Sequence, residues 1–179
     1  MKKYLLLLPA AVFPYGILLA IGCLYNNALM ARLFGGRVFP LFQCLLGLWL
    51  IGLICTVLFL VFAITGSWDG AAIAKANMVI KLGQVPAYVL IFLLGTAYLL
   101  TIFTAAISVI LLILDTMAIL LSGLVGLTAV LRGRKALGGK GAVLHGILQF
   151  VFCADVVSAV LVYRRLRAAG PPQKANQHL

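Results

Sequence analysis

The sequence predicts an all-α protein, a polytopic transmembrane helical bundle of about five spans. Of its 179 residues, 65% are hydrophobic and only 9% are charged, and the mean hydropathy is +1.21. In soluble domains about half of the residues are apolar and about a quarter are charged. Residues 82–131 contain a single charged side chain, Asp115. As one helix this stretch would be about 75 Å long, against a hydrocarbon core of ~30 Å, so it must fold back on itself.

We expect a single transmembrane domain over residues 1–167, followed by a disordered polar tail over residues 168–179. Each expected span is an apolar run close to, or longer than, the ~20 residues that cross a bilayer. The five spans are residues 4–24, 38–65, 85–103, 105–131 and 141–163.

The first run follows two lysines and resembles a signal peptide, with a possible lipoprotein cleavage site at Cys23. Its uncharged stretch continues to Ala31, however, and Pro9 and Pro14 interrupt it. These features favour a retained span over a cleaved leader. A glycine pair within residues 26–37 then predicts a loop before the second span.

Residues 71–84 predict a short amphipathic helix, either at the interface or leading into the third span. Its apolar residues recur every three or four positions, away from Lys75 and Lys81. Length alone forces a turn in the long apolar stretch, which we place at residues 101–104. Residues 132–140 are the most basic segment and predict a cytoplasmic loop that faces lipid head groups.

Orientation depends on the last apolar segment. With five spans and an internal N-terminus, eight basic residues lie on the cytoplasmic side and six outside. If residues 141–163 re-enter the membrane and leave the tail inside, the division is twelve against two. The positive-inside rule therefore favours four spans, whereas the length of the segment favours five.

The net charge of +11 comes from basic residues at the ends of apolar runs, where they contact anionic lipid head groups. No zinc-finger spacing or aromatic-interleaved basic patch predicts a nucleic-acid site. The four cysteines all lie in apolar segments without a C-x-x-C pair. We therefore expect no metal site and no nucleic-acid partner.

Two aspartates, Asp115 and Asp155, lie inside apolar segments, where a charge is costly and indicates function by default. In an antiparallel hairpin closed by residues 132–140, they lie sixteen and fourteen residues from the helix ends that flank the loop. Both would then lie ~21–24 Å from the loop and face one another. Two carboxylates in one dry site predict a proton or cation site. The alternative is that each aspartate hydrogen-bonds across helices and has a structural role.

His145 and Gln149 lie four residues apart and share a helix face. A metal or proton relay would use such a face, but no carboxylate or second histidine stands at ligand spacing, which favours a histidine that reaches the interface. A ridge of small residues, Ala118, Ser122 and Gly126, predicts close helix packing, within the chain or against another subunit.

Three strings, at residues 81–88, 101–104 and 145–155, resemble a family of short bacterial multi-pass integral membrane proteins of unknown function. The resemblance covers about the second half of the chain. It implies a bacterial inner (plasma) membrane, and it implies no activity, cofactor or catalytic residue.

The sequence contains no Ser/His/Asp order, no H-E-x-x-H and no nucleotide-binding loop, so we expect neither enzymatic activity nor a cofactor. Our first expectation is a structural or accessory subunit that packs against a membrane protein partner or a second copy of itself. The alternative is a small proton or cation transporter, or a channel subunit, that uses Asp115 and Asp155.

Overall fold

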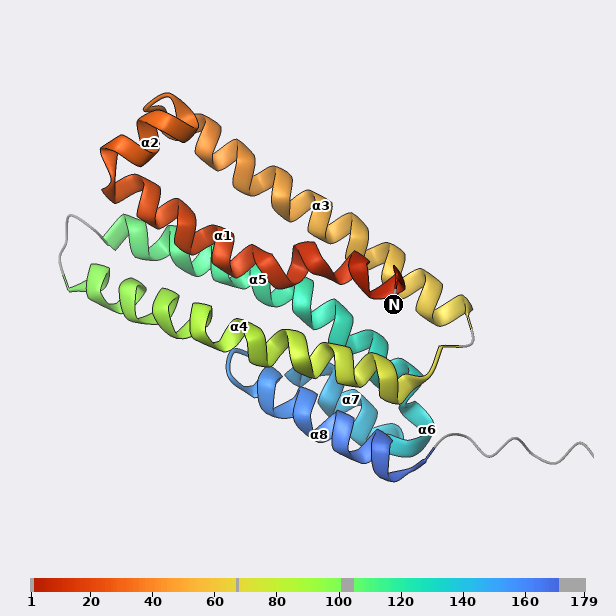
Figure 1. Cartoon of the computed structure of the whole chain (residues 1–179). Coiled ribbons are helices and arrows are strands. Elements are labelled where there is room, and N and C mark those ends of the chain that lie inside the picture. Colours follow the sequence, from red (N-terminus) through yellow and green to blue (C-terminus); the bar gives the residue numbers. More distant parts are fainter. Residues whose placement is uncertain (1, 67, 101–104, 171–179) are drawn as a thin grey trace, which may run out of the picture.

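The computed structural model describes residues 2–66, 68–100 and 105–170, and the elements in these ranges are helices, which confirms the all-α prediction. Four of them are long and apolar enough to cross a membrane and form an elongated bundle (Figure 1). These are α1 (Leu8–Tyr25), which follows the short 3-10 helix η1 (Lys2–Leu7), and α3 (Val38–Thr65), α4 (Gly70–Leu99) and α5 (Ala105–Arg132). The described part of the chain therefore has four candidate spans, which is the number that the charge rule favours.

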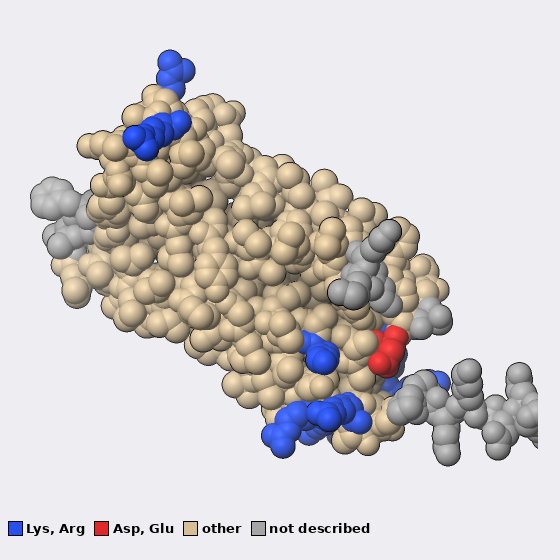
Figure 2. All heavy atoms as spheres, in the orientation of Figure 1, with Lys and Arg blue, Asp and Glu red and all other residues tan. Residues whose placement is uncertain are grey.

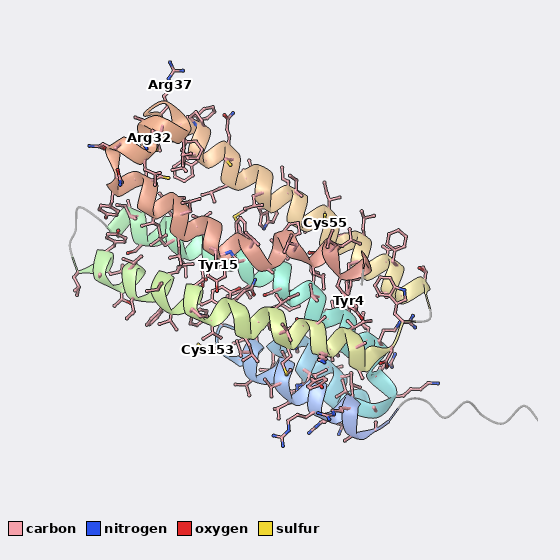
Figure 3. All side chains as sticks on the ribbon, viewed as in Figure 1. Tyr4, Tyr15, Arg32, Arg37, Cys55 and Cys153 are labelled. Carbon is pink, nitrogen blue, oxygen red and sulfur yellow. The ribbon has the colours of Figure 1, made fainter. Side chains whose placement is uncertain are left out.

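Helix α1 is tied to α4 at the point where a proline interrupts its hydrogen bonds. Pro14 has no N–H, so the carbonyl of Ala10 lacks its helical donor. Gln84 of α4 supplies one, with Nε2 2.8 Å from the Ala10 oxygen. The hydroxyl of Tyr15, labelled in Figure 3, donates to the carbonyl of Gly83. A buried amide therefore replaces the backbone bond that Pro14 removes.

The connection between α1 and α3 contains a helix where the sequence predicted a loop. Helix α2 (Asn27–Phe34) begins at a capping residue, because Asn26 Oδ1 accepts from the N–H of Leu29 at 3.1 Å. It ends at Gly35, whose φ of 59° is the left-handed conformation that glycine adopts without strain. The capping residue Asn26 and the terminating Gly35 both lie within residues 26–37, the segment that was predicted to be a loop.

Helices α3 and α5 begin and end within one residue of the predicted spans. They pack against each other and against α1. The indole Nε1 of Trp49 in α3 donates to the carbonyl of Met117 in α5 at 3.2 Å. The half-buried Trp49 therefore has a backbone partner for its indole N–H within an apolar helix.

Helix α4 differs most from the sequence-based expectation of a separate amphipathic helix followed by a span from residue 85. It is one continuous helix with Pro86 in its interior. Asp69 caps it, with its two carboxylate oxygens 3.1 and 3.2 Å from the N–H groups of Ala71 and Ala72. Lys81 consequently lies eleven residues, or about 16 Å, inside a helix of membrane length. The expected turn at residues 101–104 lies outside the described residues.

The structure corrects the expected fifth span over residues 141–163. In its place are α7 (Gly139–Leu148) and α8 (Ala154–Ala168), preceded by the short α6 (Arg134–Leu137). The chain reverses between them, where Cys153 has a φ of 63°. We call residues 139–168 the C-terminal hairpin. It packs along α4 and α5 over one half of the bundle (Figure 1). Of the expected tail, residues 171–179 lie outside the described residues.

Basic residues lie mainly at one end of the bundle. The start of α1, the α3–α4 connection, α6 and the end of α8 all lie at this end (Figure 1). Figure 2 shows lysine and arginine side chains gathered there, around α6–α8. Arg32 and Arg37 lie at the opposite end (Figure 3). The charge distribution is therefore strongly asymmetric, and the positive-inside rule predicts that the basic end faces the cytoplasm.

We expect a fluorescent reporter fused after Leu179 to be active in the cytoplasm, because the basic end of the bundle carries the end of α8. An alkaline phosphatase insertion at Gly36, on the end with two arginines, should be active on the other side. A C-terminal phosphatase fusion with full activity would instead indicate that the C-terminal hairpin crosses the membrane.

Candidate functional site

A buried ion pair connects α4 to the C-terminal hairpin. Nζ of Lys81 lies 2.7 Å from Oδ2 of Asp155, and the two side chains are 0% and 3% exposed. Nζ also donates to the carbonyl of Gln149 at 3.3 Å. The second carboxylate oxygen of Asp155 accepts from the N–H of Val156 at 2.8 Å. Both charges are therefore neutralised and hydrogen-bonded within the protein, as buried charges require.

The position of the ion pair follows from the break in the C-terminal hairpin. Non-helical backbone at membrane depth is tolerated only where protein groups satisfy it. Helix α7 ends just before Gln149, whose carbonyl accepts from Lys81, and Asp155 lies in the first turn of α8. A cation at a helix C-terminus and an anion at an N-terminus both interact favourably with the helix dipoles. Lys81 therefore stabilises the reversal of the chain as well as pairing with Asp155.

A neutral hydrogen-bond network extends the ion pair along the hairpin. Nδ2 of Asn77 lies 3.4 Å from Oε1 of Gln149, and Nε2 of Gln149 donates to Oγ of Ser158 at 3.1 Å. The same hydroxyl lies 3.0 Å from Nδ1 of His145. These four side chains are between 0% and 4% exposed. The network joins α4, α7 and α8 through polar groups that pair mainly with one another.

His145 acts here as a neutral hydrogen-bonding group. Burial lowers the pKa of His145 below its usual value of 6.5, and the positive charge of Arg165 lowers it further. The imidazole is then uncharged near neutral pH, which suits its contact with Ser158. The structure thus places His145 and Gln149 in one buried network, and a proton relay through them stays a prediction.

The small residues of α5 make room for the hairpin. Ala118, Ser122 and Gly126 are all buried within the chain. A Cβ atom at Gly126 would lie 2.0 Å from Oε1 of Gln149, so no side chain fits there without displacing that amide. One at Gly123 would lie 2.6 Å from the ring of Phe150. The predicted ridge therefore continues into a surface on which the reversing segment of the hairpin packs.

Asp115 and Asp155 have different surroundings. The predicted span over residues 141–163 would have made them face one another, and the structure has two helices of a hairpin in its place. Asp155 pairs with Lys81, whereas Asp115 lines a cavity of about 220 Å³ between α4 and α5. Oδ1 of Asp115 is buried and has no hydrogen-bond partner among the described residues. The structure therefore provides two separate carboxylate environments in place of one shared site.

Lys81 and Asn77 were not predicted to belong to a site, because residues 71–84 were expected to form a short amphipathic helix at the interface or leading into the third span. With Gln84 and Tyr88 they form a series spaced four, three and four residues apart, which is one face of an α-helix. All four are buried, and the hydroxyl of Tyr88 lies 3.3 Å from Oε1 of Gln84. Polar residues that share one helix face within a mostly apolar segment indicate a buried polar site, and this pattern could have been recognised in the sequence.

Among the described residues, no three His, Cys, Asp or Glu side chains are grouped so that they could hold a metal ion. Comparison with known protein families, with curated proteins and with solved structures found no match. The resemblance to short bacterial membrane proteins stays a prediction.

Proposed function

We propose that this multi-pass membrane protein is a non-enzymatic structural or accessory subunit of a bacterial inner-membrane complex. The single observation that supports this proposal is the use of the intramembrane polar side chains. Lys81, Asp155 and Gln149 contact one another inside the protein. Catalysis or transport needs polar groups that face a ligand or a water-filled path. Here the same groups hold the C-terminal hairpin in place.

The proposed role is to present a fixed hairpin, beside the basic end of the bundle, to another protein in the same membrane or to a second copy of this chain. Two features make the hairpin rigid. Its backbone reversal is anchored by Lys81, and its inner surface packs on glycine positions of α5. A preformed surface loses little conformational entropy on binding, which favours assembly.

Proton and cation flux in proteoliposomes tests this proposal. We expect the native protein to conduct no more than protein-free vesicles. Asp155→Asn should lose stability, because Lys81 is then buried without its counter-charge. Asp69→Asn removes the same charge at the start of α4 and is the matched control, since asparagine caps a helix as well as aspartate does.

The alternative function, a small proton or cation transporter, has one observation in its favour. Oδ1 of Asp115 is buried without a hydrogen-bond partner in the described part of the chain, and such a group is available to a proton or a cation. Flux through the native protein that disappears in Asp115→Asn or Asp155→Asn, with unfolding in detergent unchanged, would contradict the structural role and establish transport.

A further inference from the structure

The cavity beside Asp115 lies between α4 and α5, and neither Lys81 nor Asp155 lines it. Its volume of about 220 Å³ is enough for a small organic molecule. Apart from Asp115, its walls are largely apolar, and one of them carries an aromatic ring. The main lining residues are Ile91, Phe92, Leu99, Leu111, Leu112 and Asp115.

Most polar side chains at this cavity already have partners. Oγ of Ser108 donates to the carbonyl of Gly95 at 2.6 Å, and Oγ of Thr96 donates to the carbonyl of Phe92 at 2.9 Å. Asp115 differs, because its buried Oδ1 has no hydrogen-bond partner among the described residues. The cavity therefore combines a largely apolar surface with a carboxylate whose Oδ1 has no hydrogen-bond partner in the described part of the chain.

This combination selects a ligand by its chemistry. An anion would be repelled by Asp115. Calcium and magnesium ions need about six oxygen ligands, and no group of three His, Cys, Asp or Glu side chains surrounds this point in the described residues. A ligand with one positive charge and an apolar body fits both the carboxylate and the walls. The ring of Phe92 adds a favourable surface for a quaternary ammonium group.

We propose that the cavity between α4 and α5 binds a small lipophilic organic cation, whose ammonium group pairs with the Asp115 carboxylate. This binding activity is separate from the structural role of the hairpin, because the cavity shares neither Lys81 nor Asp155 with the ion pair.

Binding of benzyltrimethylammonium to the purified full-length protein in lipid nanodiscs tests this inference, with empty nanodiscs as the blank. We expect saturable binding to the native protein and a loss of about tenfold or more in affinity for Asp115→Asn, as for removal of one partner of a buried charge pair. Neopentylbenzene, in which carbon replaces the charged nitrogen, should not compete. Asp69→Asn, which removes a charge outside the cavity, should bind as the native protein does.

A second variant tests the binding site without changing Asp115, so that the conclusion does not depend on whether Asp115→Asn folds. Gly95 lines the cavity and has open space where a Cβ would stand. Gly95→Leu should therefore fill the cavity, keep the carboxylate and abolish binding. The inference is overturned if native protein shows no saturable binding, if neopentylbenzene competes equally, or if both cavity variants bind as tightly as native protein.

Discussion

Lys81→Met is expected to lower the free energy of unfolding by about 3–5 kcal/mol, the cost of removing one partner of a buried ion pair. Methionine keeps the volume of the side chain but removes the donor to Asp155 and to the Gln149 carbonyl. Reversible unfolding in mixed detergent micelles measures the loss. Hydrogen exchange should also increase in residues 149–168, while α1 and α3 stay protected, because the pair anchors only the hairpin.

Lys75→Met is the matched control for this change. Lys75 lies six residues earlier in the same helix and is exposed. The same substitution there should change stability by no more than about 0.5 kcal/mol, as for most surface sites. If both variants were equally stable, the ion pair would contribute nothing to the fold.

Gly126→Ala is expected to destabilise the protein by about 1–3 kcal/mol, the usual cost of adding a methyl group to a packed interior. The new Cβ would lie 2.0 Å from Oε1 and 2.4 Å from Cδ of Gln149. That amide would have to move, and its contacts with Asn77 and Ser158 would lengthen. Thermal unfolding in detergent measures the effect.

Gly47→Ala provides the comparison, because Gly47 is also inside a membrane-length helix but has open space where the Cβ would stand. It should be neutral or stabilising by about 0.5–1 kcal/mol, since alanine loses less backbone entropy than glycine in a helix. An equal loss in both variants would contradict this account, because the loss at Gly126 could then not be assigned to its contact with Gln149.

The spans whose bounds were predicted most accurately are those for which hydrophobicity alone determines where the helix begins and ends. Residues 38–65 and 105–131 are long uninterrupted apolar runs, and α3 and α5 reproduce them within one residue. Length together with charge also left four spans open as an alternative. The positive-inside rule favoured that alternative, because a fifth crossing by residues 141–163 would leave eight basic residues on one side and six on the other.

The hairpin was missed because nothing local marks its turn. Residues 141–163 contain no proline, and no glycine occurs after Gly146 in that segment. The reversal occurs instead at Cys153, whose φ of 63° is unusual for a residue other than glycine. Such a conformation persists only where the surrounding structure stabilises it, here by bonds from Lys81 and by packing on α5. The backbone conformation at Cys153 therefore depends on tertiary contacts with helices that are distant in the sequence.

Asp155 was identified as a residue of interest, but its partner was not. We compared it with Asp115, the other intramembrane carboxylate, and treated Lys81 as an interfacial residue. The cost of an unpaired charge in the membrane would have favoured an oppositely charged partner. The pairing could not be predicted from local sequence patterns, because Lys81 and Asp155 are 74 residues apart.

The central claim is that the Lys81–Asp155 ion pair holds the C-terminal hairpin against α4. A double-mutant cycle of Lys81→Met and Asp155→Asn, measured by reversible unfolding in mixed micelles, tests it most directly. We expect the double variant to lose less stability than the sum of the single losses, with a coupling energy of about 1.5–3 kcal/mol. Losses that add to within about 0.5 kcal/mol would show that the two side chains do not interact, and would contradict the claim.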